Sequence, residues 1–441
     1  MMRSPRNSFE IGELLQSPED GADIYLTINH VLQSVAEEEL EKAVKKSEAK
    51  SGSAIIIDPW TGEILALAQY PYFYPEHYRK YFNDPLMIEH TRVKSITDAI
   101  EPGSVMKALS VAVGLIANKA SERPLFDPDD KIATSNGVFP GRSKPVVDGL
   151  LYPFLNMDMA LQKSANIYTA RVIEKVVNTL GPQWYREQLS QFGLGQSTGI
   201  ELHSETKGFI PTPGKKYKNG MLEWLVGTPP SMSMGYSLQV SYMQLVRAYS
   251  VIANGGRLIQ PTLIRKIIKG DQILLDNTDP ERTQQFPRVM SPEISRRLIK
   301  GMKFVTKPGG LGFRGDVIGY TEAGKSSTSK KNFEGKYSET RYRASFIGIV
   351  PASKPRFVIL VGMDEPKYGF IPGLGKNHNG GVCCAPVFGK IAQRSLEYAQ
   401  VPPDDPGTFP KGDHRYRPTG KDWTEETRLL QEMYQKWNNK R

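Results

Sequence analysis

The chain has 441 residues, enough for one large domain with extensions or for two domains. Its formal net charge is +10, but the basic residues are dispersed and no nucleic-acid-recognition motif accompanies them, so the charge equally suits an enzyme beside an anionic membrane surface. Two adjacent cysteines and six scattered histidines exclude a disulfide framework and show no metal-ligand spacing. No apolar run approaches the roughly 18 to 20 residues of a membrane span, and no signal peptide opens the chain.

The first elements in chain order are a helix and a hairpin. Residues 30 to 46 carry apolar side chains at helical spacing, from Leu32 to Val44. Residues 53 to 58 and 63 to 69 are apolar runs on either side of an Asp-Pro-Trp-Thr-Gly turn, a pattern that predicts two antiparallel strands.

A candidate nucleophile follows at residue 104. The pattern Ser-x-x-Lys begins at Ser47, Ser104, Ser204 and Ser327, and any single match is more often a polar helix face or loop. Only Ser104 follows a Pro-Gly turn and opens an apolar stretch, which predicts a loop that leads into a buried helix. Residues three apart share a helix face, so Lys107 can reach the Ser104 hydroxyl. Burial favours a neutral lysine, which can then take the serine proton as a base.

A second polar motif, Ser164-Ala165-Asn166, stands just ahead of an apolar run with helical spacing. A hydroxyl and a carboxamide at this place can relay a proton and hold a substrate amide. By itself, however, such a tripeptide is more often a helix cap.

The third motif is Lys325-Ser326-Ser327-Thr328, and its apolar lead-in predicts a strand. We expect a polar loop over residues 330 to 343, followed by a hairpin of strands 344 to 350 and 356 to 362. A strand at the edge of a cleft can pair with an extended peptide through its backbone. Its lysine and hydroxyls can then meet a terminal carboxylate.

The remaining elements are helical. Ser291-Pro292 predicts the start of a helix with one apolar face, and residues 388 to 398 predict a closing helix. After a Pro, Gly and Asp-rich linker, residues 423 to 438 carry Leu429, Met433 and Trp437 at spacing four, with Leu430 and Tyr434 alongside. This amphipathic helix either docks on the domain or a partner or frays in solvent. Hairpins near both ends with helices between them predict an α+β fold, an antiparallel sheet covered by helices.

The order Ser-x-x-Lys, Ser-x-Asn, Lys-Ser-Ser resembles that of penicillin-recognising acyl-serine enzymes, whose third motif is Lys-Thr-Gly. Further segments resemble the transpeptidase domain of class B penicillin-binding proteins, most like the division-associated, septal D,D-transpeptidase: residues 21–29, 57–66, 234–237, 252–256 and 385–388. The resemblance covers roughly residues 20 to 400. It implies the penicillin-binding-protein/β-lactamase-like fold, with a five-stranded antiparallel sheet flanked by helices and an all-helical lobe.

The resemblance also implies roles for the first two motifs. Ser104 would be the acylated nucleophile and Lys107 its general base. Ser164 would shuttle a proton, and Asn166 would bind the amide of the donor peptide. The substrate would be a peptidoglycan stem peptide that ends in D-alanyl-D-alanine, and β-lactams would mimic it. No metal or organic cofactor is expected.

In the third motif, Lys325 and Ser326 would hold the terminal carboxylate of the substrate. The backbone N–H groups of Ser104 and Thr328 would form the oxyanion hole. Ser327 stands where the family has glycine, which allows close backbone approach. We expect its side chain to lie beside the cleft among the substrate-binding residues, and to narrow the cleft for bulky β-lactams unless it points away.

Domain organisation and cellular context follow from the same resemblance. We expect residues 1 to 20 to be an N-terminal extension or a remnant of a pedestal, residues 21 to 400 the transpeptidase domain, and residues 401 to 441 a linker and helix. The class normally has an N-terminal membrane anchor, which we expect to be missing from this chain. The expected place is the periplasmic, extracytoplasmic face of the membrane, with stem peptides, β-lactams and membrane proteins of cell division as partners and no nucleic acid.

Three alternatives share the motif order. A β-lactamase would need a base that activates water for deacylation, and no segment clearly supplies a dedicated glutamate. A D,D-carboxypeptidase would use water as the acceptor. A catalytically weakened scaffold of the division machinery would explain the altered third motif, although all five polar residues expected in catalysis are retained.

Overall fold

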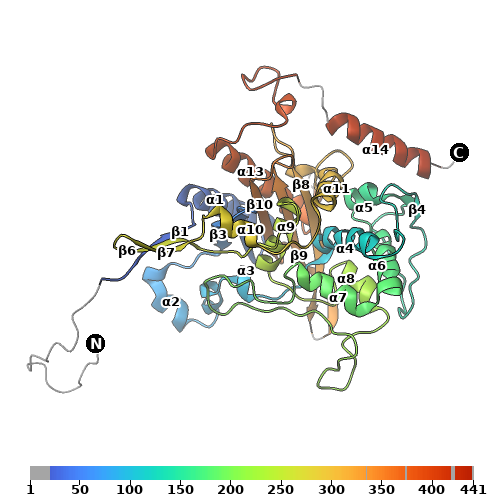
Figure 1. Ribbon diagram of the computed structural model, residues 1–441, viewed down its shortest axis with the longest axis horizontal. Coiled ribbons are helices and arrows are strands. Elements are labelled where there is room, and N and C mark those ends of the chain that lie inside the picture. The colour runs from blue at the N-terminus through green and yellow to red at the C-terminus, as the bar shows by residue number, and fades with distance from the viewer. Residues whose placement is uncertain (1–19, 334, 373–374, 419–422, 440–441) are drawn as a thin grey trace, which may run out of the picture.

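The computed structural model describes residues 20–333, 335–372, 375–418 and 423–439, so the expected N-terminal extension lies almost wholly outside the described residues. Its centre is a five-stranded sheet in the order β3-β2-β10-β9-β8, antiparallel throughout (Figure 1). The strands are β2 (Ser51–Ile57), β3 (Ile64–Tyr70), β8 (Ala323–Phe333), β9 (Lys336–Val350) and β10 (Phe357–Asp364). The predicted five-stranded antiparallel sheet and both predicted hairpins are confirmed.

Both faces of the sheet are covered. Successive side chains of a strand point to opposite faces, so Ile56 packs in the core beneath α1 (His30–Ser47) and α13 (Ala385–Tyr398), whereas Ile55 packs in the core on the other side. That second core includes α4 (Met106–Ala120) and α9 (Tyr242–Ala253). Burial on both faces explains why residues 54–57 of β2 are apolar without alternation.

A helical lobe adjoins the sheet, as expected (Figure 1). It contains α4, α5 (Met157–Lys163), α6 (Asn166–Leu180), α7 (Pro182–Gln191) and α8 (Thr228–Ser233), and α11 (Pro292–Lys303) packs against α4 and α5. Shorter elements are α2 (Tyr78–Asn83), α3 (Lys94–Thr97), α10 (Pro280–Gln285), α12 (Gly380–Cys383), β4 (Ile132–Ala133), β5 (Phe154–Leu155), β11 (Phe370–Ile371) and β12 (Gly375–Lys376). Within the described ranges, no helix is both long and apolar enough to cross a bilayer.

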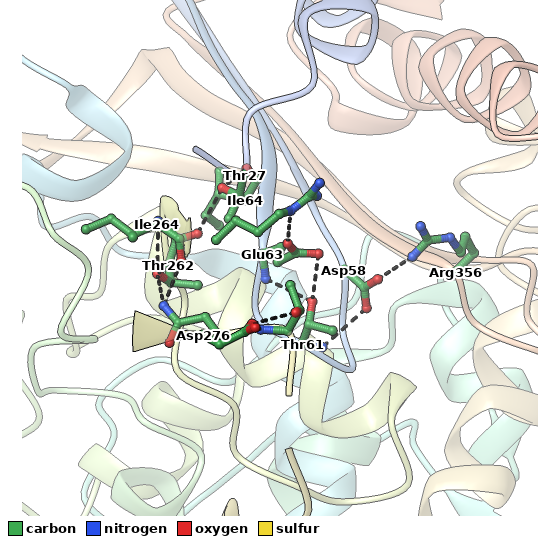
Figure 2. Close-up of polar contacts among 12 residues, drawn as sticks. Thr27, Asp58, Thr61, Glu63, Ile64, Thr262, Ile264, Asp276 and Arg356 are labelled. Atoms are coloured by element: carbon green, nitrogen blue, oxygen red, sulfur yellow. Dashed lines mark hydrogen bonds and ion pairs between the residues drawn. The ribbon is translucent and has the colours of Figure 1, made fainter. Parts of the chain in front are cut away.

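A three-stranded arm of β1 (Asp23–Leu26), β6 (Ile264–Lys269) and β7 (Gln272–Asp276) projects from the domain (Figure 1). Figure 2 shows the polar contacts at its base. The Thr27 hydroxyl donates to the Ile64 carbonyl at 2.6 Å, and Arg265 pairs with Glu63 at 2.6 Å. These contacts tie the arm to the β2–β3 hairpin.

The prediction of a polar loop over residues 330 to 343 is wrong. Strands β8 and β9 continue through most of this stretch as a hairpin, with Lys330 opposite Tyr342 and Phe333 opposite Lys336. The hairpin extends into solvent, so its side chains are polar although its backbone is paired. Without an apolar face to bury, a strand has no alternating pattern that would reveal it.

The C-terminal helix α14 (Trp423–Asn438) docks on the domain. Tyr434 lies edge-on to Tyr152 with ring centroids 6.3 Å apart, and the Asn438 side chain bonds both backbone groups of Phe154 at 2.8 and 3.0 Å. The face predicted from the spacing is partly wrong, because Leu429 and Met433 are 50% and 40% exposed. The docked face carries Trp423, Thr427, Leu430, Tyr434 and Trp437.

Two adjacent leucines of α14 allow a matched test of this docking. Leu430 is 6% exposed and Leu429 is 50% exposed. Leu430→Ala should weaken the docking of α14 by about 2 kcal/mol, because it deletes a buried side chain. Amide exchange in α14 should then speed up by roughly thirtyfold, whereas Leu429→Ala should change it little. Equal effects of the two substitutions would show that α14 is not docked through this face.

Candidate active site

Ser104 lies in a 3-10 turn, Gly103–Val105, that leads directly into the buried helix α4, as predicted. Gly103 has φ +61°, and a Cβ at this position would lie 2.5 Å from the Ser327 hydroxyl oxygen. Only glycine therefore fits this turn. The turn holds Ser104 half-buried beside strand β8.

Two buried lysines meet at one hydroxyl. The Lys107 ammonium donates to the Ser164 carbonyl and, at 3.1 Å, to the Ser164 hydroxyl. The Lys325 ammonium donates to the same hydroxyl at 2.8 Å. Both lysines are almost completely buried, at 1% and 0% exposure. Among the described residues, Lys107 thus bonds Ser164 rather than Ser104, the partner suggested by the helix spacing.

Ser164 reaches this position because it ends helix α5 in the left-handed conformation, with φ 55°. A serine in this region of backbone space is strained and is retained where the surroundings demand it. The turn places its hydroxyl between α4 and β8 and lets α6 begin two residues later, at Asn166.

Burial controls the protonation of the two lysines. It lowers the pKa of Lys107 to about 7, although the nearby Asp148 carboxylate acts in the opposite direction. Burial, together with the positive charge of Lys107, holds the pKa of Lys325 well below its usual range. Two adjacent buried ammonium groups repel each other, so a neutral amine is available near pH 7. Such an amine can act as a base.

Sequence reasoning missed Asp148. One of its carboxylate oxygens accepts the N–H groups of Asn166 and Ile167, which caps α6. The other oxygen is buried without a hydrogen-bond partner in the described structure, and burial raises the pKa of this carboxyl. Asp148 belongs to no motif and lies in a loop far along the chain from Lys107, so only the tertiary structure brings them together.

Asn166, Ser326 and Thr328, the remaining predicted residues, lie next to residues of the same site. The Asn166 carboxamide donates to the Val147 carbonyl at 2.6 Å, which fixes its orientation. Ser326 is 6% exposed, and its carbonyl accepts from Lys325 at 3.1 Å. The Thr328 hydroxyl accepts the Gly380 N–H at 3.1 Å. The three motifs thus converge from the start of α4, the α5–α6 turn and β8.

Ser327 does not narrow the cleft with its side chain. Its hydroxyl donates to the Pro102 carbonyl at 2.7 Å, and the Ser329 hydroxyl on the same strand face donates to the Glu101 carbonyl at 3.1 Å. The side chain, which is 2% exposed, points into the turn before Ser104. Any contact of Ser327 with a substrate would therefore come from its backbone.

Apart from Ser327, the other Ser-x-x-Lys matches lie outside the site. Ser47 ends helix α1, is buried and donates to the Ala43 carbonyl at 2.8 Å. Ser204 is exposed in a loop.

Comparison with known proteins agrees with this geometry. The family model of the penicillin binding protein transpeptidase domain matches residues 52–393, well over half of the chain. The chain belongs to this family. The resemblance to class B penicillin-binding proteins is thereby confirmed.

Curated relatives of this transpeptidase-family chain include proteins named as transpeptidases. The probable peptidoglycan D,D-transpeptidase PbpC of Pseudomonas aeruginosa is 33% identical over 395 residues, covering 89% of the chain and 62% of the relative. The probable peptidoglycan D,D-transpeptidase PenA of Neisseria gonorrhoeae is 30% identical, with 92% and 60% covered. The peptidoglycan D,D-transpeptidase FtsI of Escherichia coli is 30% identical, with 87% and 57% covered. The chain thus spans about three fifths of the length of these relatives.

Solved structures show the same fold. The transpeptidase domain of penicillin-binding protein 3 from Burkholderia pseudomallei matches with a TM-score of 0.65 and 31% identity, covering 86% of this chain and 97% of that one. A structure titled as a peptidoglycan glycosyltransferase from Burkholderia ambifaria matches with a TM-score of 0.66 and 29% identity, covering 86% and 99%.

Asp148 should tune the base. Its carboxylate raises the pKa of Lys107 against the larger lowering caused by burial. Asp148→Asn keeps an oxygen that can cap α6 but removes the charge, so the pKa of Lys107 should fall further and the neutral amine should persist to lower pH. The midpoint of the rise of penicillin acylation rate with pH should therefore shift downward. An unchanged midpoint would show that the Asp148 carboxylate does not influence the pKa of Lys107.

Ser327 should act through the nucleophile turn. Ser327→Ala leaves the buried Pro102 carbonyl without its partner, at a cost of about 1–3 kcal/mol. If about 1.4 kcal/mol of this cost is added to the activation free energy, acylation slows about tenfold. The slowing should be equal for small and bulky β-lactams, because the side chain does not face the cleft. If Ser327→Ala instead made acylation faster for bulky β-lactams alone, the Ser327 side chain would narrow the cleft after all.

Proposed function

We propose that this chain is a serine-type D,D-transpeptidase domain that cross-links peptidoglycan stem peptides through an acyl-enzyme on Ser104, in septal cell-wall synthesis. The observation that carries the proposal is the Ser164 hydroxyl held between two buried amines, Lys107 and Lys325, beside the turn of Ser104. The names of the relatives supply the substrate class.

In the acylation step, neutral Lys107 takes the proton of the Ser104 hydroxyl. The serine oxygen attacks the carbonyl carbon of the penultimate D-alanine and expels the terminal D-alanine. Ser164 relays the proton from Lys107 to the amine of the departing D-alanine, so the proton lost by Ser104 ends on the leaving group and no cofactor takes part. Its bond to both lysines suits this relay.

The other residues position the donor. The backbone N–H groups of Ser104 and Thr328 stabilise the negative oxygen of the tetrahedral intermediate. Asn166 binds the donor amide, and Lys325 with Ser326 holds the terminal carboxylate. In the second step an amine of a neighbouring stem peptide attacks the acyl-enzyme and releases Ser104.

The proposal also covers organisation and context. We assign residues 21–400 to the catalytic domain and residues 401–441 to a linker and helix, and this assignment is supported by the packing of α14 (Trp423–Asn438) on the domain. The enzyme acts at the extracytoplasmic face of the membrane, together with membrane proteins of cell division. β-Lactams acylate Ser104 as donor analogues.

Incubation with a fluorescent penicillin, followed by mass spectrometry of the intact protein, tests the site. We expect one stable adduct on Ser104 and none in Ser104→Ala, whose fold should be unchanged because Ser104 is only half-buried. Ser204→Ala is a matched control, because Ser204 also begins a Ser-x-x-Lys match but is exposed in a loop. An adduct that persists in Ser104→Ala would refute the assignment.

The same assay separates the alternatives. Rapid loss of the adduct with release of hydrolysed penicillin indicates a β-lactamase, and failure to form any adduct indicates a scaffold. Incubation with a stem pentapeptide and an amine then shows whether the amine or water accepts the acyl group. A cross-linked product supports transpeptidation, whereas loss of D-alanine without cross-linking indicates a carboxypeptidase.

A further inference from the structure

A basic groove lies outside the site of Ser104. One wall is a face of α11 that presents Arg296, Lys300 and Lys303, and the facing wall is the β9–β10 turn with Lys354. Arg288 and Trp60, which belongs to the β2–β3 turn, also line it. None of the three active-site motifs contributes to its lining.

The groove is held open by hydrogen bonds between its parts. The Trp60 indole N–H donates to the Pro355 carbonyl at 2.8 Å, and the Asn254 carboxamide donates to the Pro59 carbonyl at 2.8 Å. The Arg288 guanidinium donates to the Gly255 carbonyl at 2.5 Å. Figure 2 shows the adjacent turn, where Asp58 pairs with Arg356. A ligand would thus meet a preformed surface.

Most of the positive charge in the groove is uncompensated. No carboxylate lines it in the described part of the chain. Arg296 pairs with Glu293 at 3.6 Å, but both side chains are more than 60% exposed, so this pair is weak. Between described residues, Lys300, Lys354 and Arg288 form no ion pair, whereas the Lys303 ammonium lies over the Trp423 ring of α14, 2.6 Å from its centroid, and is thus already engaged. Several cations that face one hollow attract an anionic partner.

We propose that this groove binds an extended acidic peptide segment of a partner protein, with an apolar side chain seated against Trp60. Arg296 and Lys300 of α11 are about 6 Å apart along the helix axis, close to the roughly 6.6 Å between alternate side chains of an extended peptide. The indole N–H of Trp60 is already bonded, but the side chain is 48% exposed and offers an apolar surface.

The shape of the site favours a peptide over a lipid surface. The cations line the walls of a groove, which admits a chain but not a flat bilayer. They are also spread along a helix face rather than converging on one point, as a single phosphate would require. Apolar lining residues, Ile299 and Pro355, match a peptide that alternates carboxylates with apolar side chains.

Fluorescence anisotropy with a fluorescein-labelled peptide of alternating glutamate and leucine, about ten residues long, tests this proposal. We expect saturable binding that weakens as salt rises, and no binding of the glutamine–leucine counterpart. Lys300→Glu with Lys354→Glu should raise the Kd at least about tenfold, since it reverses charge on both walls. Trp60→Ala should weaken binding independently of salt.

The matched control reverses two exposed lysines of another loop, Lys216→Glu with Lys218→Glu, and changes net charge by the same amount. Penicillin acylation, which uses other residues, should stay at the wild-type rate in both double variants and verifies folding. Equal loss of peptide binding in the control would overturn the proposal in favour of nonspecific charge. Binding to phosphatidylglycerol vesicles through Lys300 and Lys354, without peptide binding, would overturn it in favour of a membrane surface.

Discussion

The burial of Lys107 and Lys325 around one serine hydroxyl is the constraint on which the site depends. Moving an ammonium group out of water costs several kcal/mol unless it is paired, and no carboxylate forms an ion pair with either lysine in the described structure. Part of this cost is relieved because the low pKa values leave a neutral amine. The reactivity of the site therefore comes from the burial of the two lysines, which lowers their pKa values. The packing of α4, α5 and β8 produces this burial.

Strand β8 links this chemistry to the position of the nucleophile. Lys325, Ser327 and Ser329 alternate along the strand and therefore share one face. Lys325 reaches Ser164, whereas the two serines bond the carbonyls of Pro102 and Glu101 just before Ser104. One strand thus sets both the base network and the nucleophile turn. The unusual Ser327 adds a bond to this turn instead of an obstruction.

The turn before Ser104 is anchored from a further side. The Glu101 carboxylate accepts the Ser237 N–H at 2.8 Å and the Tyr337 hydroxyl at 2.9 Å, so the polar β8–β9 hairpin is attached to the nucleophile segment. The domain also gathers cations in the groove along α11, whose lining includes no carboxylate among the described residues. Catalysis and the proposed peptide binding use different elements of the same rigid core.

The sequence by itself determined the helix at residues 30–46, the hairpins of β2–β3 and β9–β10, and the three motifs, because burial imposes periodicity and the chemistry requires particular side chains in a local order. It did not determine the polar hairpin at residues 330–343, because that hairpin buries no apolar face. It also did not determine which of the neighbouring apolar rows of α14 docks, because Leu429 and Met433 follow the same helical spacing as Leu430 and Tyr434. Asp148 and the direction of the Ser327 hydroxyl were decided only by the tertiary structure. Their partners, Lys107 and Pro102, lie far away along the chain. Packing within the helical lobe brings Asp148 near Lys107, and packing of the nucleophile turn against β8 brings Ser327 to Pro102.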